Sequence, residues 1–233
     1  NSENVRPGDL FIAKIGEKID SHLFVERALT KGARAAIISR DINLAGQFAD
    51  RPIIKIKAPE NYNVLLTNIA KKFYKLDKKK IKIIGVTGTN GKTTTVYLIY
   101  NILKKAGIKA MLISTIAVEL SRQKLAVSNT TPGPLEFYKL VALAQEKNID
   151  YIVMEISSHS IKQRRIDFND VYCAVFTNLT QDHLDYHITM DDYAFTKSEL
   201  FRLMNMRGYA VINIDSEFSN LMIEQAKDKK IIS

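Results

Sequence analysis

Apolar residues in the first third of the chain fall into short strand-like runs and helix-like repeats. The runs at 9–13, 35–38 and 53–56 are rich in Ile, Ala and Phe, and each is typical of a short strand. Segments 24–29 and 65–73 repeat apolar residues every three or four positions, which predicts helices. The expected buried face of the second helix consists of Leu65, Leu66, Ile69, Ala70 and Phe73. This pattern predicts a small α/β domain.

From residue 81 onward the strand-like runs are longer and helix-like segments separate them. Runs at 81–87, 111–113, 151–154, 171–176 and 209–212 predict strands. The helix after the first run has an expected inner face of Val96, Ile99, Ile102, Leu103 and Ala106, and the helix between the second and third runs has Phe137, Leu140, Val141 and Ala144. Alternating strands and helices indicate crossovers and a mostly parallel sheet, so the predicted fold class is α/β.

The lysine-rich segment 74–80 shows neither the strand-like nor the helix-like pattern of apolar residues, which is typical of a linker. We therefore expect two domains, 1–77 and 78–233.

Composition narrows the class of protein. With 46% hydrophobic and 25% charged residues among 233, the chain is typical of a soluble globular protein. No apolar run approaches the roughly 18 residues of a membrane helix, so we expect a cytoplasmic protein without membrane insertion. The net charge of +9 is carried by scattered residues without interleaved aromatics, which does not favour nucleic-acid binding. The single Cys173 lies in an apolar run and is expected to be a buried structural thiol.

A glycine-rich loop follows the first strand of the second domain. Glycines allow backbone N–H groups to approach phosphate oxygens, and the start of the following helix adds its positive dipole end. Lys92 would neutralise the outer phosphates of ATP, and the Thr93 hydroxyl would bind Mg²⁺. The strict phosphate-loop pattern has glycine at the position that Val86 occupies here. The expected nucleotide contacts are Gly88, Thr89, Asn90, Gly91, Lys92, Thr93 and Thr94.

Two further strand ends carry polar groups. Glu155 follows the 151–154 strand, at the edge of the sheet where a carboxylate could bind Mg²⁺ beside the phosphate loop. A solvated glutamate explains this residue equally well. Segment 177–187 holds two histidines and two aspartates after its strand but no zinc-ligand set. Lys197, judged by its own surroundings, is typical of a solvated helix lysine.

Four motifs in order resemble one known family. They are Gly88–Thr93, Asn129–Pro132, Glu155 to Arg165 and Thr177–His187, and the start of the chain at 5–13 and 16–22 also fits. Together they resemble the Mur ligases over nearly the whole chain. The Ser157-Ser158-His159-Ser160 segment favours the members that add the third amino acid of the peptidoglycan stem.

The resemblance implies an ATP-driven amide synthesis through an acyl phosphate. The substrates would be UDP-N-acetylmuramoyl-L-alanyl-D-glutamate and an amino acid, either lysine or meso-diaminopimelate, and the enzyme would be a cytoplasmic monomer. A D-alanyl-D-alanine-adding ligase or a folylpolyglutamate synthase is the alternative within related enzymes, and a nucleotide switch or nucleic-acid motor is the alternative outside them.

Site residues follow by the same resemblance. The catalytic set would be Lys92, Glu155, His183 and Lys197, and the Mg²⁺ ligands would be Thr93, Glu155, His183 and a carbamylated Lys197. The UDP-linked substrate would contact Ser2, Asn129, Thr130, Thr131, Ser157, Gln163 and Arg165. The resemblance further implies that the start is clipped, that the central domain continues beyond residue 233, and that a third domain selects the amino acid.

Overall fold

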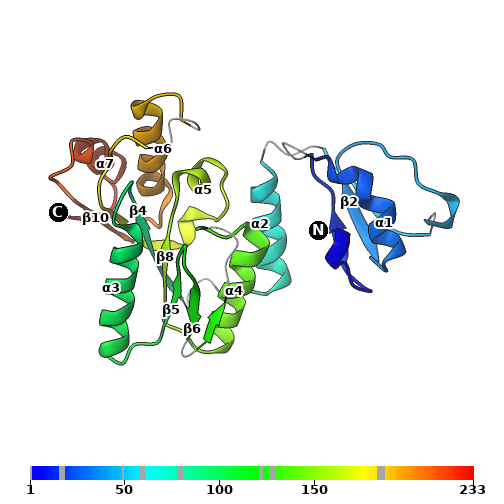
Figure 1. Ribbon diagram of the computed structural model, residues 1–233, viewed down its shortest axis with the longest axis horizontal. Coiled ribbons are helices and arrows are strands. Elements are labelled where there is room, and N and C mark those ends of the chain that lie inside the picture. The colour runs from blue at the N-terminus through cyan, green and yellow to red at the C-terminus, as the bar shows by residue number, and fades with distance from the viewer. Residues whose placement is uncertain are drawn as a thin grey trace. The chain divides into compact units, whose positions relative to one another are not determined.

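The computed structural model describes residues 2–15, 19–48, 50–57, 61–77, 81–120, 123–125, 130–182 and 187–233. The chain forms two compact units, Asn1–Tyr62 and Asn63–Ser233. Each unit has its own sheet (Figure 1).

The first unit is built on a three-stranded parallel sheet. Its strands are β1 (Leu10–Ile12), β2 (Ala35–Ile38) and β3 (Ile53–Lys55), in the order β1-β2-β3, and helix α1 (Val25–Thr30) precedes β2. Short 3-10 helices occupy Ser2–Asn4, Ser21–Phe24 and Gly46–Phe48. The core contains Phe11, Val25, Leu29, Ile38 and Phe48. The three strands and the helix predicted for this region are confirmed.

The second unit contains an eight-stranded sheet in the order β11-β10-β9-β4-β8-β5-β6-β7. The strands are β4 (Lys82–Thr87), β5 (Ala110–Ile113), β6 (Val118–Leu120), β7 (Gln123–Leu125), β8 (Tyr151–Glu155), β9 (Val171–Phe176), β10 (Tyr209–Ile212) and β11 (Lys230–Ile232). All neighbours pair in parallel except β6, which is antiparallel to both β5 and β7. The predicted strands and parallel sheet are confirmed, whereas β6, β7 and β11 were not predicted.

Alternate residues of the central strands supply two separate cores. In β8, Ile152 and Met154 belong to a core cluster that includes Phe137, while Val153 belongs to a second cluster with Val96. This is the expected result when both faces of a parallel sheet are covered. Helix α3 (Lys92–Lys105) covers one face, and α4 (Pro134–Glu146) covers the other (Figure 1).

The remaining helices are α2 (Tyr62–Phe73), α5 (Ser158–Lys162), α6 (Met190–Leu203) and α7 (Ser219–Gln225), and a 3-10 helix occupies Phe168–Asp170.

Two predicted helix faces need correction. In α3, Val96, Ile99 and Leu103 pack against the core as predicted, whereas Ile102 is 65% exposed and Ala106 is also exposed. Tyr100 is buried instead, because it follows Val96 at the four-residue spacing that places both on one side. In α2 Phe73 is 77% exposed, although Ala70 is buried as expected. The predicted face of α4 is confirmed in full, since Phe137, Leu140, Val141 and Ala144 are all buried.

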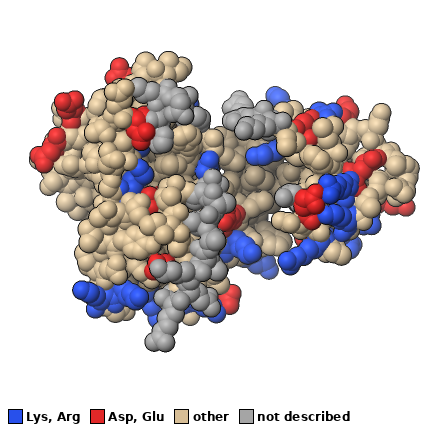
Figure 2. Space-filling view, in the orientation of Figure 1, with Lys and Arg blue, Asp and Glu red and all other residues tan. Residues whose placement is uncertain are grey.

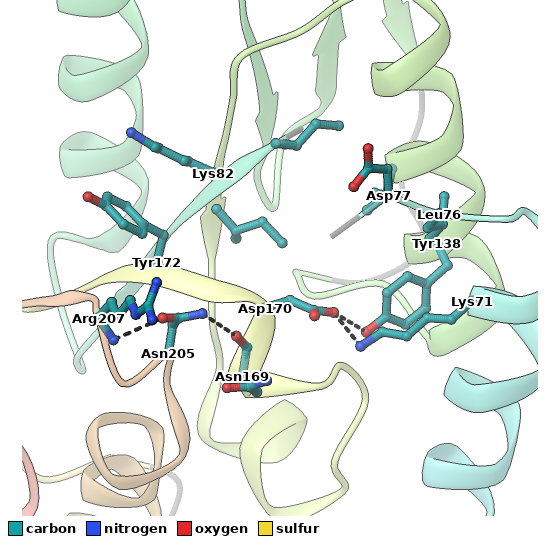
Figure 3. A pocket seen from close by; sticks show the side chains of 13 residues that line it. Lys71, Leu76, Asp77, Lys82, Tyr138, Asn169, Asp170, Tyr172, Asn205 and Arg207 are labelled. Atoms are coloured by element: carbon teal, nitrogen blue, oxygen red, sulfur yellow. Dashed lines mark hydrogen bonds and ion pairs between the residues drawn. The ribbon is translucent and has the colours of Figure 1, made fainter. Parts of the chain in front are cut away.

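Helix α2 packs with the second unit, so the structural division falls earlier than the boundary expected at 77/78. Ala70 joins the larger core, and Lys71 Nζ lies 2.7 Å from Asp170 Oδ2 and 2.5 Å from Asp167 Oδ2. Tyr138 donates its hydroxyl to Asp170 at 2.9 Å. Figure 3 shows Lys71, Tyr138 and Asp170 together at one side of a pocket. This pocket lies at the amino ends of β4 and β9 and has a volume of about 320 Å³. The chain just before and within the lysine-rich segment is therefore held to the second unit by tertiary contacts.

Charged side chains are mixed on the surface. On the face drawn in Figure 2, acidic residues are interspersed with basic ones over both units. Within the part of the chain that the structure describes, no helix has both the length and the apolar character needed to cross a membrane.

We expect Phe137→Ala to lower the free energy of unfolding of the second unit by about 3–5 kcal/mol, because it empties a fully buried ring site. Phe73→Ala removes the same ring from a 77% exposed position and should cost little. Urea unfolding of both variants measures the difference, and equal losses would contradict the assignment of the two faces.

The thiol of Cys173 should react slowly in the folded protein. Burial raises its pKa from 9.0 to about 11, so the reactive thiolate fraction at pH 8 falls by about 100-fold. A thiol reagent followed by absorbance should label the native protein far more slowly than the urea-unfolded protein. Comparable rates in the two states would show that Cys173 is accessible.

Candidate active site

The glycine-rich loop joins the end of β4 to the start of α3, as expected. Gly91 is the N-cap of α3 and has φ of 82°, in the left-handed region that favours glycine. Gly88 has φ of 146°, and a Cβ there would collide with the Thr177 side chain and come within 3.0 Å of the Asn178 carbonyl. Both glycines are therefore required by the backbone, and the loop presents N–H groups at a helix start, where anions bind.

The segment that follows β9 braces this loop. The main-chain N–H of Thr89 donates to the Asn178 carbonyl at 2.9 Å, and that of Asn90 donates to Asn178 Oδ1 at 3.0 Å. Thr177 Oγ1 donates to the Asn90 carbonyl at 2.7 Å, and the Thr180 N–H donates to Thr89 Oγ1 at 3.0 Å. The first residues of the predicted 177–187 motif thus hold the loop in shape.

Two lysine side chains converge on one carbonyl of the loop. Lys92 Nζ donates to Gly88 O at 2.9 Å and to Thr89 O at 2.7 Å, and Lys197 Nζ donates to Gly88 O at 3.0 Å. Burial lowers the pKa of both amines, and burial together with the neighbouring Lys92 charge lowers the pKa of Lys197 to about 7. The expectation of a solvated helix lysine at 197 is wrong, because α6 buries it at 1% exposure beside the Tyr193 ring.

Glu155 is the carboxylate that faces the loop. It ends β8, is 1% exposed, and accepts a hydrogen bond from Thr93 Oγ1 at 3.0 Å through its Oε1 atom. Thr115, which follows β5, donates its N–H to Oε1 at 2.9 Å and its hydroxyl to Oε2 at 3.1 Å. The alternative of a solvated glutamate is excluded by this burial and by these three contacts.

The segment 130–165 brings together several of the residues expected to bind substrate. Thr131 is buried, and its hydroxyl donates to the Glu155 carbonyl at 3.0 Å and accepts from the Ser157 N–H at 3.2 Å. Arg165 donates to the Thr131 carbonyl and to Gln163 Oε1, both at 2.9 Å. These polar side chains form one connected network beside Glu155.

Three other expected site residues do not belong to the described part of this site. His183 and Asn129 fall outside the described residues, and Ser2 belongs to the first unit. His187 is buried, its Nδ1 lies 3.3 Å from Asp192 Oδ2, and burial lowers its pKa.

A cavity of about 340 Å³ connects these groups. It is lined by Thr89 to Thr94 of the loop, by Lys197, by Glu155 with Thr115, and by Thr130, Ser157 and Ser158. Among the described residues, no three His, Cys, Asp or Glu side chains gather as a metal-ligand cluster. One carboxylate beside a threonine hydroxyl nevertheless fits Mg²⁺, which binds hard oxygen atoms and takes its remaining ligands from phosphates and water.

Thr115 was missed by sequence reasoning. It comes two residues after the end of β5, in the sheet that carries the loop, and polar residues near the carboxyl ends of parallel strands are the signal that could have identified it.

Two protein-family models together match the whole chain. The description "Mur ligase middle domain" fits residues 86–233, and "Mur ligase family, catalytic domain" fits residues 1–87. The "UDP-N-acetylmuramoyl-L-alanyl-D-glutamate--2,6-diaminopimelate ligase" of Caldanaerobacter subterraneus is 39% identical over 229 residues, covering 98% of this chain and 46% of that protein. The protein of the same name from Clostridium tetani is 38% identical, with 98% and 46% covered.

Solved structures show the same fold. A structure titled with the same ligase name has a TM-score of 0.81 at 28% identity, over 100% of this chain and 46% of the other. A MurF ligase from Thermotoga maritima, solved with ADP, has a TM-score of 0.61 at 25% identity, over 100% of this chain and 48% of the other. The chain spans about half the length of the relatives it matches. With its phosphate loop, buried carboxylate and sheet arrangement in place, the chain belongs to the Mur ligase family.

Proposed function

We propose that the protein carrying this chain is an ATP-dependent ligase that adds the third amino acid to UDP-N-acetylmuramoyl-L-alanyl-D-glutamate. The observation that supports it most is the cavity in which Lys92 and the Thr93–Glu155 pair face Thr130 and Ser157. A phosphate site and a polar substrate site thereby share one space. Such an enzyme acts in the cytoplasm as a monomer, without nucleic acid.

The loop would hold the phosphates of ATP. Its N–H groups and the Lys92 ammonium offset phosphate charge, and releasing Lys92 from Gly88 O and Thr89 O frees its protons for the nucleotide. Mg²⁺ held by Thr93 and Glu155 would supply the further positive charge that the γ-phosphoryl group needs during transfer. His183 is proposed to help hold a second ion.

The substrate carboxylate would attack the γ-phosphorus, forming a new O–P bond while the bond to ADP breaks. The amine of the incoming amino acid then attacks the acyl phosphate, an amide forms, and phosphate leaves with the loss of one amine proton. Asn129, Thr130, Ser157, Gln163 and Arg165 are proposed to hold the UDP-linked substrate, with Thr131 fixing the Ser157 backbone. Ser2 is proposed to contact the uridine end.

Lys197 is proposed to be carbamylated. Its amine is buried against the loop, and a pKa of about 7 leaves a large neutral fraction at physiological pH. The neutral amine attacks CO₂, an N–C bond forms, and one proton leaves, so a cation becomes an anionic oxygen ligand suited to Mg²⁺.

The amino acid is proposed to be 2,6-diaminopimelate. That compound appears in the names of the relatives from Caldanaerobacter and Clostridium, which are 39% and 38% identical.

The complete protein should release ADP from ATP only when the UDP-linked dipeptide and 2,6-diaminopimelate are both present. Lys92→Ala should lower kcat/KM by about 100-fold or more, because a charge on the transferring phosphates is lost. Lys82→Ala, at an exposed lysine on the far end of β4, is the matched control. ADP release with lysine but not with 2,6-diaminopimelate would show that lysine is the amino acid added. No release with either amino acid would overturn the proposed function.

Carbamylation can be measured directly with ¹³C-bicarbonate and NMR. One carbamate signal is expected, lost in Lys197→Ala and kept in Lys82→Ala. At fixed dissolved CO₂ the signal should grow as the pH rises through about 7, because the Lys197 pKa lies there and only the neutral amine reacts. A signal that persists in Lys197→Ala would place the modification elsewhere.

A further inference from the structure

Thr115 stands two residues beyond the end of β5, next to the Glu155 carboxylate at the end of β8. The two strands are paired in parallel, with Ile113 opposite Met154, so the residues that follow them leave the sheet side by side. Thr115 uses both of its donors on Glu155: its N–H reaches Oε1 at 2.9 Å, and its hydroxyl reaches Oε2 at 3.1 Å. A single residue therefore holds both carboxylate oxygens.

This double contact limits rotation of the carboxylate plane. Oε1 also accepts the Thr93 hydroxyl at 3.0 Å, which by itself would leave the other oxygen free to swing. Thr115 Oγ1 lies 3.3 Å from Thr130 Oγ1. The single Thr115 hydroxyl proton is therefore within reach of both oxygens, and the shorter of the two contacts is the one to Glu155.

We propose that Thr115 is a positioning residue that fixes Glu155 in the orientation a divalent cation at Thr93 requires. The inference rests on the proposed function, because it takes Glu155 as the cation's carboxylate. Groups that hold a metal ligand in place commonly change metal affinity by about 10–100-fold when they are removed. Thr115 itself contacts neither the cation nor the reacting atoms in this scheme.

The test measures Mn²⁺ binding to the complete protein in the presence of ADP, by electron paramagnetic resonance. Thr115→Val keeps the β-branch and the main-chain N–H but removes the hydroxyl, and it should raise the Mn²⁺ dissociation constant by about 10-fold. Thr115→Ala should do the same without adding bulk. Thr115→Ser restores the hydroxyl and should return the constant to within about twofold of the original.

Two controls separate this role from a general loss of structure. ADP affinity without metal should stay the same in all Thr115 variants, since the phosphate loop is untouched. Thr30→Val removes an exposed hydroxyl that bonds only within its own helix, to Glu26 O, and should leave Mn²⁺ binding unchanged.

An unchanged Mn²⁺ constant in both Thr115→Val and Thr115→Ala overturns the proposal, as does failure of serine to restore it. Absence of Mn²⁺ binding by the unaltered protein with ADP also overturns it. The measurement needs neither the UDP-linked substrate nor an amino acid. Failure of ADP release with every amino acid would therefore remove the proposed function, while hydroxyl-dependent Mn²⁺ binding would still support the role of Thr115.

Discussion

The pairing of β4 between β8 and β9 is the constraint on which the site depends. Val86 lies opposite Glu155 on one side and Val175 on the other, so the phosphate loop, the buried carboxylate and the bracing segment all leave the sheet at one edge. Parallel strands must deliver their carboxyl ends to the same side. Residues more than sixty positions apart therefore meet without any long-range signal in the sequence beyond strand order.

Hydrophobic patterning predicted the central sheet well because its strands are buried on both faces. Runs such as 81–87 and 171–176 are apolar almost throughout, and such runs are hard to mistake once helices separate them. The orientation of α3 was harder to predict. Tyr100 carries a polar hydroxyl on a ring that packs well inside, so the pattern of apolar residues alone does not place it on the buried face.

The site was predictable only where its residues form a local sequence motif. Gly88, Lys92 and Thr93 can be recognised from their local spacing in the sequence. The role of Lys197 depends on tertiary structure, because α6 buries its side chain against the loop. The sequence does not indicate such burial, because lysines in helices usually lie on the solvent-exposed face. The position of Thr115 just beyond a strand end is a weak signal, because its importance depends on which atoms of Glu155 it contacts.

The anchor between Lys71 and the two aspartates bears on how the chain can be divided. Ala70, Tyr74 and Leu76 lie against the same core that contains Phe137 and Ile152. A shortened chain beginning at residue 78 would uncover this apolar surface and leave Asp167 and Asp170 beside each other without their shared ammonium group. Such a piece would tend to self-associate. A piece that keeps α2 would retain the contacts of Ala70 and Lys71 with the core of the second unit.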